Sequence, residues 1–243
     1  MEMQPRTIAW IFIACALGIG LHLCLNDPDH SLPRALQFMV YGAGILTGIL
    51  VGVWRLPAAG IHPYTPRVEM WKQLTGKEVE KDNEFATKAK TWGIKNESAA
   101  VEVYAALRLN KSIMPNHTQY RHKTHRWLVG IPDALIVDTK TGKVEGILEV
   151  KCPYAPDMSR VVPHQTMSAI YYHMPQVQGY MEILDVEYCD LMSYTTKGSV
   201  IFRFMRDRAY WLEMLPALVE FWTHMRRDTP PSEKHANSKT LEK

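Results

Sequence analysis

The chain has 243 residues, with 28 lysines and arginines against 25 acidic residues and a formal net charge of +3. This length allows one substantial hydrophobic core and excludes two large domains joined by linkers. The nearly balanced charge does not by itself indicate a nucleic-acid partner, so any basic surface must be local. The four cysteines form no C-x-x-C pair and no zinc-ligand cluster, which predicts reduced thiols in a reducing compartment.

Two uncharged apolar runs, residues 7–25 and 36–54, lie near the amino terminus. Each is about as long as the roughly 20 residues that a helix needs to cross a bilayer. Arg6 precedes the first run and Arg55 follows the second, so the positive-inside rule places both chain ends in the cytosol. We therefore expect residues 1–56 to form a membrane-associated helical hairpin. A pair of buried core helices in a soluble intracellular protein is the alternative, and a cleaved signal peptide fits less well because it lacks an A-x-A site.

Residues 57–227 have the composition of a globular domain. Apolar spacing predicts helices over residues 67–75, 83–111, 165–185 and 209–228. Strand patterns occupy residues 118–138, 146–153 and 188–207, with turn signals at 139–142 and 197–198. Helices around a central run of strands predict an α/β fold. Residues 228–243 contain no large aromatic side chain, and we expect a disordered tail there.

Charged residues stand inside two of the predicted strands. Side chains two apart in a strand share a face, so Glu149 and Lys151 are neighbours. Hairpin pairing can bring Asp133 to the same edge of the sheet. Two adjacent carboxylates repel unless a cation lies between them, and hard oxygen ligands suit Mg²⁺ or Mn²⁺. With a lysine to hold or help deprotonate water, such a site can hydrolyse a phosphodiester.

Each piece also has an ordinary structural explanation. An E-x-K triplet on a strand is often a solvated face with a weak ion pair worth about 0–1 kcal/mol. Asp133 follows Pro132 and can be a turn residue. The order and spacing of the charged residues are therefore more informative than any one of them.

The segments IPDALI and GILEVKCPY resemble the P-D-G segment and the L-E-[IVL]-K-C-P-[YF] strand of the YqaJ-like viral recombinases, which include the lambda-type exonucleases of the PD-(D/E)xK nuclease superfamily. Three more segments resemble this family in the same order: AGIHPYTPRVEMWKQLTG, TWGIKNESAAVEVY and YYHMPQVQGYMEILDVEYCDLMSY. The resemblance covers about residues 59–222. It implies a restriction-endonuclease-like core with a central mixed sheet flanked by helices. The implied activity is metal-dependent DNA hydrolysis in recombination, repair or degradation, more as an exonuclease than as an endonuclease.

The resemblance also implies roles for four residues near the strand ends. Asp133 and Glu149 would bind Mg²⁺, with Mn²⁺ as a substitute, and the backbone carbonyl of Val150 would be a further ligand. Lys151 would position and activate the nucleophilic water. DNA is the implied partner. A catalytically inactive DNA-binding or membrane-tethering module of the same fold is the alternative, which would not need this set of charges.

Two residues from helices complete the implied site. Glu97 would bind the metal or orient water at it, and Gln176 would fix the site or the phosphate. From the residues alone, Glu102 competes with Glu97. Gln178 likewise competes with Gln176, because two positions apart on a helix they point to different faces. Only the resemblance favours Glu97 and Gln176.

A basic edge is predicted before the first charged strand. Arg121, Lys123 and Arg126 suggest a DNA-facing surface, and His122 and His125 support this better than a metal site because no carboxylate or cysteine accompanies them. The aromatic residues near the carboxyl end have helical spacing typical of core: Trp211, Phe221 and Trp222.

The match departs from the family in two places. Ala134 replaces the usual glycine after the aspartate, which is tolerable only if the backbone there is ordinary strand. The apolar runs occupy the place of an amino-terminal segment with an arginine and a serine that helps family members recognise the substrate's end. The departure affects the implied selectivity for that end and the implied ring-shaped homo-oligomer more than it affects phosphate hydrolysis.

Overall fold

The computed structural model describes residues 51–52, 66–77 and 83–233, all of which belong to the unit Gly48–Lys243. Almost all of the predicted membrane hairpin lies outside these ranges. Val51 and Gly52, near the end of its second run, form strand β1 and pair in parallel with β4 (Leu128–Gly130). The strand at these two residues differs from the predicted helix and agrees with the β-branched side chain of Val51 and the low helix propensity of glycine. The rest of the predicted hairpin stays a prediction.

None of the helices in the described ranges combines the length and the apolar composition needed to cross a bilayer. The two cysteines in the same ranges, Cys152 and Cys189, are free thiols.

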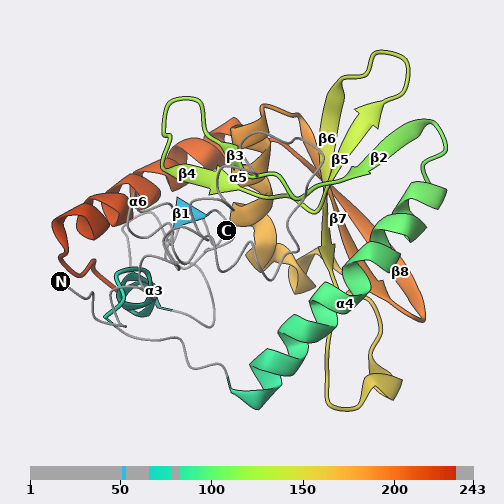
Figure 1. The fold of residues 1–243 in the computed structure, drawn as a ribbon, viewed down its shortest axis with the longest axis horizontal. Helices are drawn as coiled ribbons and strands as arrows, with labels where there is room; N and C mark the ends of the chain where they lie inside the picture. The colour runs from blue at the N-terminus through green and yellow to red at the C-terminus, as the bar shows by residue number, and fades with distance from the viewer. Residues whose placement is uncertain (1–50, 53–65, 78–82, 234–243) are drawn as a thin grey trace, which may run out of the picture. The chain divides into compact units, whose positions relative to one another are not determined.

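A five-stranded sheet with the order β2-β5-β6-β7-β8 forms the centre of the domain (Figure 1). Strands β6 and β7 run parallel and the other neighbours run antiparallel, so the sheet is mixed, as predicted. A smaller sheet has the order β1-β4-β3, with β3 at Tyr120–Arg121. The strands of the large sheet are β2 (Lys111–Pro115), β5 (Ala134–Asp138), β6 (Val144–Lys151), β7 (Tyr188–Thr195) and β8 (Gly198–Met205).

Helices cover both faces of the large sheet, which confirms the predicted α/β arrangement. The alternation of side chains along β6 shows this: Leu148 packs in a cluster with residues of α4, whereas Ile147 packs in a cluster with residues of α5 and α6. Trp211 and Phe221 are buried in the second cluster, as expected for core residues. The helices are α3 (Arg67–Leu74), α4 (Glu84–Ala106), α5 (Met174–Leu184) and α6 (Arg208–Arg227).

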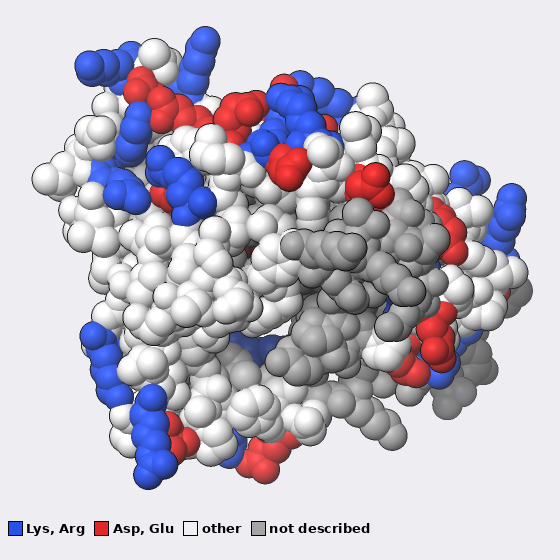
Figure 2. Space-filling model, turned by 180° about the vertical axis from the view of Figure 1, so that it is seen from behind, with Lys and Arg blue, Asp and Glu red and all other residues white. Residues whose placement is uncertain are grey.

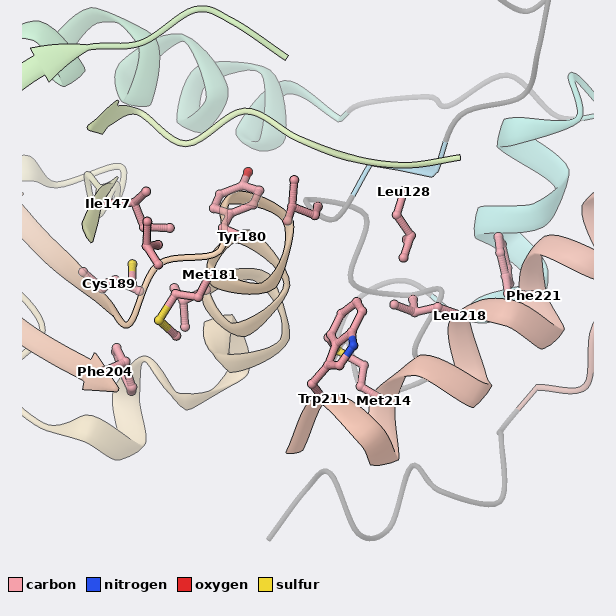
Figure 3. Packing of buried hydrophobic residues seen from close by; sticks show 14 of the residues in the cluster. Leu128, Ile147, Tyr180, Met181, Cys189, Phe204, Trp211, Met214, Leu218 and Phe221 are labelled. Carbon is pink, nitrogen blue, oxygen red and sulfur yellow. The ribbon is translucent and has the colours of Figure 1, made fainter. Parts of the chain in front are cut away.

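The larger hydrophobic cluster holds α5 and α6 in place (Figure 3). Figure 3 shows Met181 and Tyr180 of α5 beside Ile147, Cys189 and Phe204 from the strands. The same cluster continues along one side of α6, at Trp211, Met214, Leu218 and Phe221. Because α5 is packed along its length, the side chains at its first turn have fixed positions relative to β6.

Local sequence signals explain several element boundaries. The side chain of Asn83 accepts a hydrogen bond of 2.8 Å from the backbone nitrogen of Ala86 and caps α4. The predicted turn at residues 139–142 is confirmed, and Asp138 closes it by accepting from the backbone nitrogen of Thr141 at 2.7 Å. Gly142 has φ of 67°, a value that favours glycine.

Two predicted elements need correction. The helix expected over residues 165–185 begins only at Met174, because Pro175 suits the first turn of a helix and disrupts its interior. Short 3₁₀ turns precede it, at Met167–Ala169 and Tyr171–His173. The helix expected over residues 83–111 ends at Ala106, and Lys111 instead begins strand β2. This strand was not predicted, since its residues are largely exposed at the sheet edge and carry no apolar alternation.

The expected disordered tail does not begin at residue 228. Pro231 is buried, and Ser232 accepts a 3.4 Å hydrogen bond from the guanidinium of Arg67. Arg67 is itself fully buried and forms a 2.6 Å ion pair with Glu220 of α6. A buried guanidinium needs partners, and these contacts join α3, α6 and residues up to 232. Residues 234–243 of the predicted tail lie outside the described ranges.

Candidate active site

Asp133 stands immediately before β5, at the point where the pairing of β5 with β6 ends. The last paired residues are Ala134 and Leu148, so Asp133 lies opposite Glu149. Oδ2 of Asp133 accepts a 2.7 Å hydrogen bond from the backbone nitrogen of Val150. The carboxylate thus takes the position that a strand carbonyl would otherwise occupy, and it is fixed beside the carboxyl end of β6.

Glu149 is held from two directions. Its Oε1 accepts a 2.6 Å hydrogen bond from Nζ of Lys151 and a 2.8 Å hydrogen bond from Nε2 of Gln176. The side chain of Glu149 is 5% exposed and that of Lys151 is 23% exposed, so the lysine lies at the opening of a largely buried group. The structure therefore brings Asp133, Glu149 and Lys151 together, as the strand pattern predicted, and adds Gln176, which the family resemblance implied.

Gln176 and Gln178 have different surroundings, which decides between them. Gln178 donates to the backbone carbonyl of Met205 at 3.0 Å and accepts from the backbone nitrogen of Asp207 at 2.8 Å. It therefore fastens the start of α6 to α5. Gln176 faces Glu149, and its Nε2 also donates to the hydroxyl of Tyr180 at 3.0 Å. Gln176 is the site-facing residue, as the family resemblance indicated.

Tyr180 was not singled out from the sequence. It lies one helical turn after Gln176, which is the spacing at which helical side chains meet, and this signal was available. Its ring is almost fully buried, 2% exposed, within the core beneath the site. Burial, with the nearby charge of Glu149, holds the pKa of the Tyr180 hydroxyl well above its usual value. The phenol is therefore neutral and serves as a fixed hydrogen-bonding group.

Glu97 lies on the sheet-facing side of α4. It precedes the buried residues Ala100, Val101 and Tyr104 by three, four and seven positions, which places it on their face of the helix. Glu102, its rival, is exposed. The carboxyl-terminal half of α4 is anchored where the hydroxyl of Tyr104 donates to Asp190 of β7 at 2.5 Å. This geometry favours Glu97 over Glu102 as the glutamate on the sheet-facing side of α4, but among the described residues Glu97 does not complete a cluster of three carboxylates with Asp133 and Glu149.

The local charges set the protonation states near β6. Burial alone would lower the pKa of Lys151, but the carboxylates of Glu149 and Asp133 outweigh it and raise this pKa above its usual value. Lys151 is therefore an ammonium at neutral pH. Burial and the charge of Asp133 raise the pKa of the adjacent Cys152 thiol to about 11. This thiol stays protonated and is a poor nucleophile.

The residues of the site fit a magnesium ion better than a zinc ion. No cluster of three or more histidine, cysteine, aspartate or glutamate side chains with metal-ligand geometry occurs within the described ranges. The donors available at the strand ends are the carboxylates of Asp133 and Glu149 and the carbonyl of Val150. Mg²⁺ is commonly bound by one or two carboxylates, with waters and substrate phosphate oxygens as the remaining ligands. This donor set matches that pattern.

The expected basic edge is only partly basic. His122 is buried, stacks on Trp211 at 5.6 Å between ring centroids, and accepts from the backbone nitrogen of His125 at 3.0 Å. Burial and the neighbouring His125 lower its pKa, so its assignment to a basic surface is wrong. Lys123 is exposed but forms a 2.8 Å ion pair with Asp185 at the end of α5. That position is about 14 Å along the helix from Gln176.

Arg121 and Arg126 are both exposed, and a guanidinium nitrogen of Arg121 donates to the backbone carbonyl of Arg126 at 3.3 Å. Among the described residues on the face shown in Figure 2, basic and acidic side chains lie beside one another at several places. This distribution agrees with the nearly neutral composition. A DNA contact by this edge stays a prediction.

Ala134, which replaces the family's usual glycine after Asp133, fits the backbone of β5. Ala134 is fully buried in the ordinary extended backbone of β5 and packs in the cluster that faces α4. No positive φ is required there, so the absence of glycine does not disturb the position of Asp133.

Comparisons with solved structures agree with this fold. An alkaline exonuclease from Laribacter hongkongensis, LHK-Exo, superimposes with a TM-score of 0.58 at 18% identity, covering 77% of this chain and 92% of that one. A phage related exonuclease from Haemophilus somnus 129PT gives a TM-score of 0.51 at 15% identity, covering 76% and 96%. LHK-Exo in complex with dAMP gives a TM-score of 0.55 at 17% identity, covering 74% and 89%.

A search of curated protein sequences found no match. The sequence model of the YqaJ-like viral recombinase domain matches residues 57–188, which include every residue of the candidate site. This match spans more than half of the 243 residues. The chain therefore belongs to the YqaJ-like viral recombinase domain family.

Proposed function

We propose that the protein hydrolyses DNA phosphodiester bonds in a Mg²⁺-dependent reaction, as an exonuclease of the viral recombinase type. The observation that carries this proposal is the double contact at Glu149. Its Oε1 accepts from both Lys151 and Gln176, opposite Asp133 on the neighbouring strand. A binding module would not need two buried carboxylates and an ammonium at one sheet edge, because their burial is costly without a ligand or chemistry that uses them.

The chain's own residues have distinct roles in this proposal. Asp133, Glu149 and the carbonyl of Val150 would hold Mg²⁺, and Glu97 would bind the ion or orient water at it. The bound ion would act as a Lewis acid that stabilises negative charge on the scissile phosphate. Lys151, with a partly exposed ammonium, would donate a hydrogen bond to the attacking water and stabilise charge on the phosphate. Gln176 would fix the orientation of Glu149.

Family membership supports a nuclease, and the two exonucleases with similar folds support the exonuclease mode. The Laribacter hongkongensis protein is described as an alkaline exonuclease, and one of its structures contains dAMP. A deoxynucleoside monophosphate is what hydrolysis from a DNA end releases. The same product is expected from this chain.

End-labelled linear DNA and closed circular DNA test the proposal when incubated with the full chain in Mg²⁺ or in EDTA. We expect degradation of the linear DNA to mononucleotides in Mg²⁺, survival of the circle, and no reaction in EDTA. Cleavage of the circle would replace the exonuclease mode with an endonuclease. Survival of both DNAs in Mg²⁺ and in Mn²⁺ would contradict the proposed function.

A further inference from the structure

Three aromatic side chains gather beyond the end of β6, on the side covered by α4. The ring of Tyr154 lies 5.5 Å from the ring of Phe85 and 6.4 Å from that of Trp92, measured between centroids. Phe85 is 50% exposed, although it is a large apolar residue on the first turn of a helix. This group belongs to neither of the two buried core clusters. The group therefore presents one exposed ring, that of Phe85, beside the two half-buried rings of Trp92 and Tyr154.

The aromatic group lies next to the candidate active site. Tyr154 follows Lys151 by three residues, and an extended chain of that length spans about 10 Å. Figure 1 shows the amino-terminal half of α4 at the same end of the sheet as the segment that follows β6. A DNA strand with its scissile phosphate at Lys151 would therefore have its neighbouring nucleotides within reach of these rings.

Basic residues accompany the rings along α4. Phe85, Lys88, Trp92 and Lys95 are spaced by three, four and three residues, so they lie on one face of the helix. Lys88 is paired with Glu84 at 2.7 Å, but both side chains are largely exposed, at 57% and 82%. Such a surface pair is weak and can be exchanged for a phosphate contact. Alternating aromatic and basic side chains suit a nucleic-acid strand, because rings stack on bases and ammonium groups attract phosphates.

We propose that Phe85, together with Tyr154 and Trp92, forms a stacking platform for an unpaired base of the DNA strand in the active site, with Lys88 and Lys95 beside the adjacent phosphates. This inference rests on the proposed function for the identity of the strand. The platform would make the protein bind more tightly those DNA strands that have unpaired bases next to the cleaved bond. A strand that lacks bases at that position loses the stacking and keeps only the phosphate contacts.

The test measures binding and chemistry separately with the full chain. Binding of a fluorescent oligothymidylate and of an abasic oligomer of equal length is measured in EDTA, where no cleavage is expected. We expect the wild type to prefer oligothymidylate, and Phe85→Leu to lose about 10-fold in affinity for it while binding the abasic oligomer unchanged. Phe85→Trp retains the aromatic ring and should retain the preference. Leu212→Ala, at a 68% exposed apolar position on α6, is the matched control and should bind like the wild type.

Hydrolysis of methyl p-nitrophenyl phosphate in Mg²⁺ reports on the chemistry alone, because this phosphodiester carries no base that could stack on the platform. Phe85→Leu should hydrolyse this ester at the wild-type rate. Equal binding of both oligomers by the wild type, or wild-type affinity for oligothymidylate in Phe85→Leu, would overturn the platform. Failure to cleave either DNA or the ester would instead count against the proposed function, whatever the binding results.

Discussion

Nε2 of Gln176 lies 2.8 Å from Oε1 of Glu149 and joins the first turn of α5 to the carboxyl end of β6. The amide nitrogen has two hydrogens, and the second is directed to the hydroxyl of Tyr180 at 3.0 Å. Both hydrogens are therefore used, which fixes the orientation of the amide. Through this contact, packing beneath the site controls the position of the carboxylate that we assign to the metal.

Replacing Gln176 should separate a role in the site from a role in the fold. Gln176→Leu removes the hydrogen bond to Glu149, and we expect a loss of about 100-fold in the cleavage rate. Gln178→Leu is the matched control on the same helix. It leaves the backbone groups of Met205 and Asp207 without Gln178, so stability should fall by about 1–3 kcal/mol while the rate per folded molecule is retained. Single-turnover cleavage and urea unfolding of both variants measure these quantities, and a reversed pattern would contradict the assignment.

Tyr180 should act by positioning Gln176. Tyr180→Phe keeps the buried ring and removes only the hydroxyl that accepts from Gln176. We expect the maximal rate to fall by about 10-fold, since the amide gains freedom to turn, with little change in the KM for DNA. Steady-state kinetics with linear DNA measures both constants. An unchanged maximal rate would show that the amide of Gln176 is held without this hydroxyl.

Gly130 of β4 allows α5 to lie close to the strand. A methyl group added at Gly130 would be 2.7 Å from Cδ1 of the Tyr180 ring, so the ring must move. Gly130→Ala should therefore cost about 1–3 kcal/mol of stability and lower the cleavage rate, because Tyr180 positions Gln176. Gly93→Ala is the control, since the space around Gly93 in α4 is open. That change should raise stability by about 0.5–1 kcal/mol and leave the rate unchanged. Chemical unfolding and cleavage assays of Gly130→Ala and Gly93→Ala measure both quantities.

Asp190 predicts a pH dependence of stability. Although burial opposes its ionisation, the guanidinium of Arg203 at 2.7 Å and the hydroxyl of Tyr104 hold the pKa of Asp190 below its usual value. A carboxyl whose pKa is lower in the folded state stabilises the fold above the unfolded pKa, about 3.9, and loses this contribution as the pH falls below it.

In Asp190→Asn, the free energy of unfolding at pH 7 should be about 2 kcal/mol lower than in the wild type, because the ion pair with Arg203 is lost. The loss stays this small because the half-exposed guanidinium of Arg203 can be hydrated. Between about pH 5 and pH 3 the variant should lose less stability than the wild type, so the two curves converge. Urea unfolding across this range measures the difference. Parallel curves would mean that Asp190 has the same pKa in the folded and unfolded states.

The sequence predicted those parts of the site that follow from local periodicity. A strand places Glu149 beside Lys151 because side chains two apart share a face, and a hairpin turn at residues 139–142 brings Asp133 opposite Glu149. These placements are confirmed by the strand register. The choice of Gln176 over Gln178 did not follow from periodicity, since both are buried on the same helix and only their partners distinguish them.

Contacts between residues far apart in the chain could not be predicted in this way. Tyr104 and Asp190 are 86 positions apart, and nothing in either segment specifies the other. Strand β2 depends on pairing with β5 rather than on an apolar pattern of its own. The burial of Arg67 depends on α6 and on Ser232. Such features arise from packing, which a pattern of single residues does not contain.

The most direct test of the account compares two glutamates of β6. Glu149→Gln removes the charge that we assign to the metal. Glu145→Gln removes an equal charge at a position six residues before Lys151 on the same strand, where Glu145 is paired with Lys111. We predict that cleavage of end-labelled linear DNA in Mg²⁺ falls by at least about 100-fold in the first variant and stays near wild type in the second. Wild-type cleavage by Glu149→Gln would contradict the account.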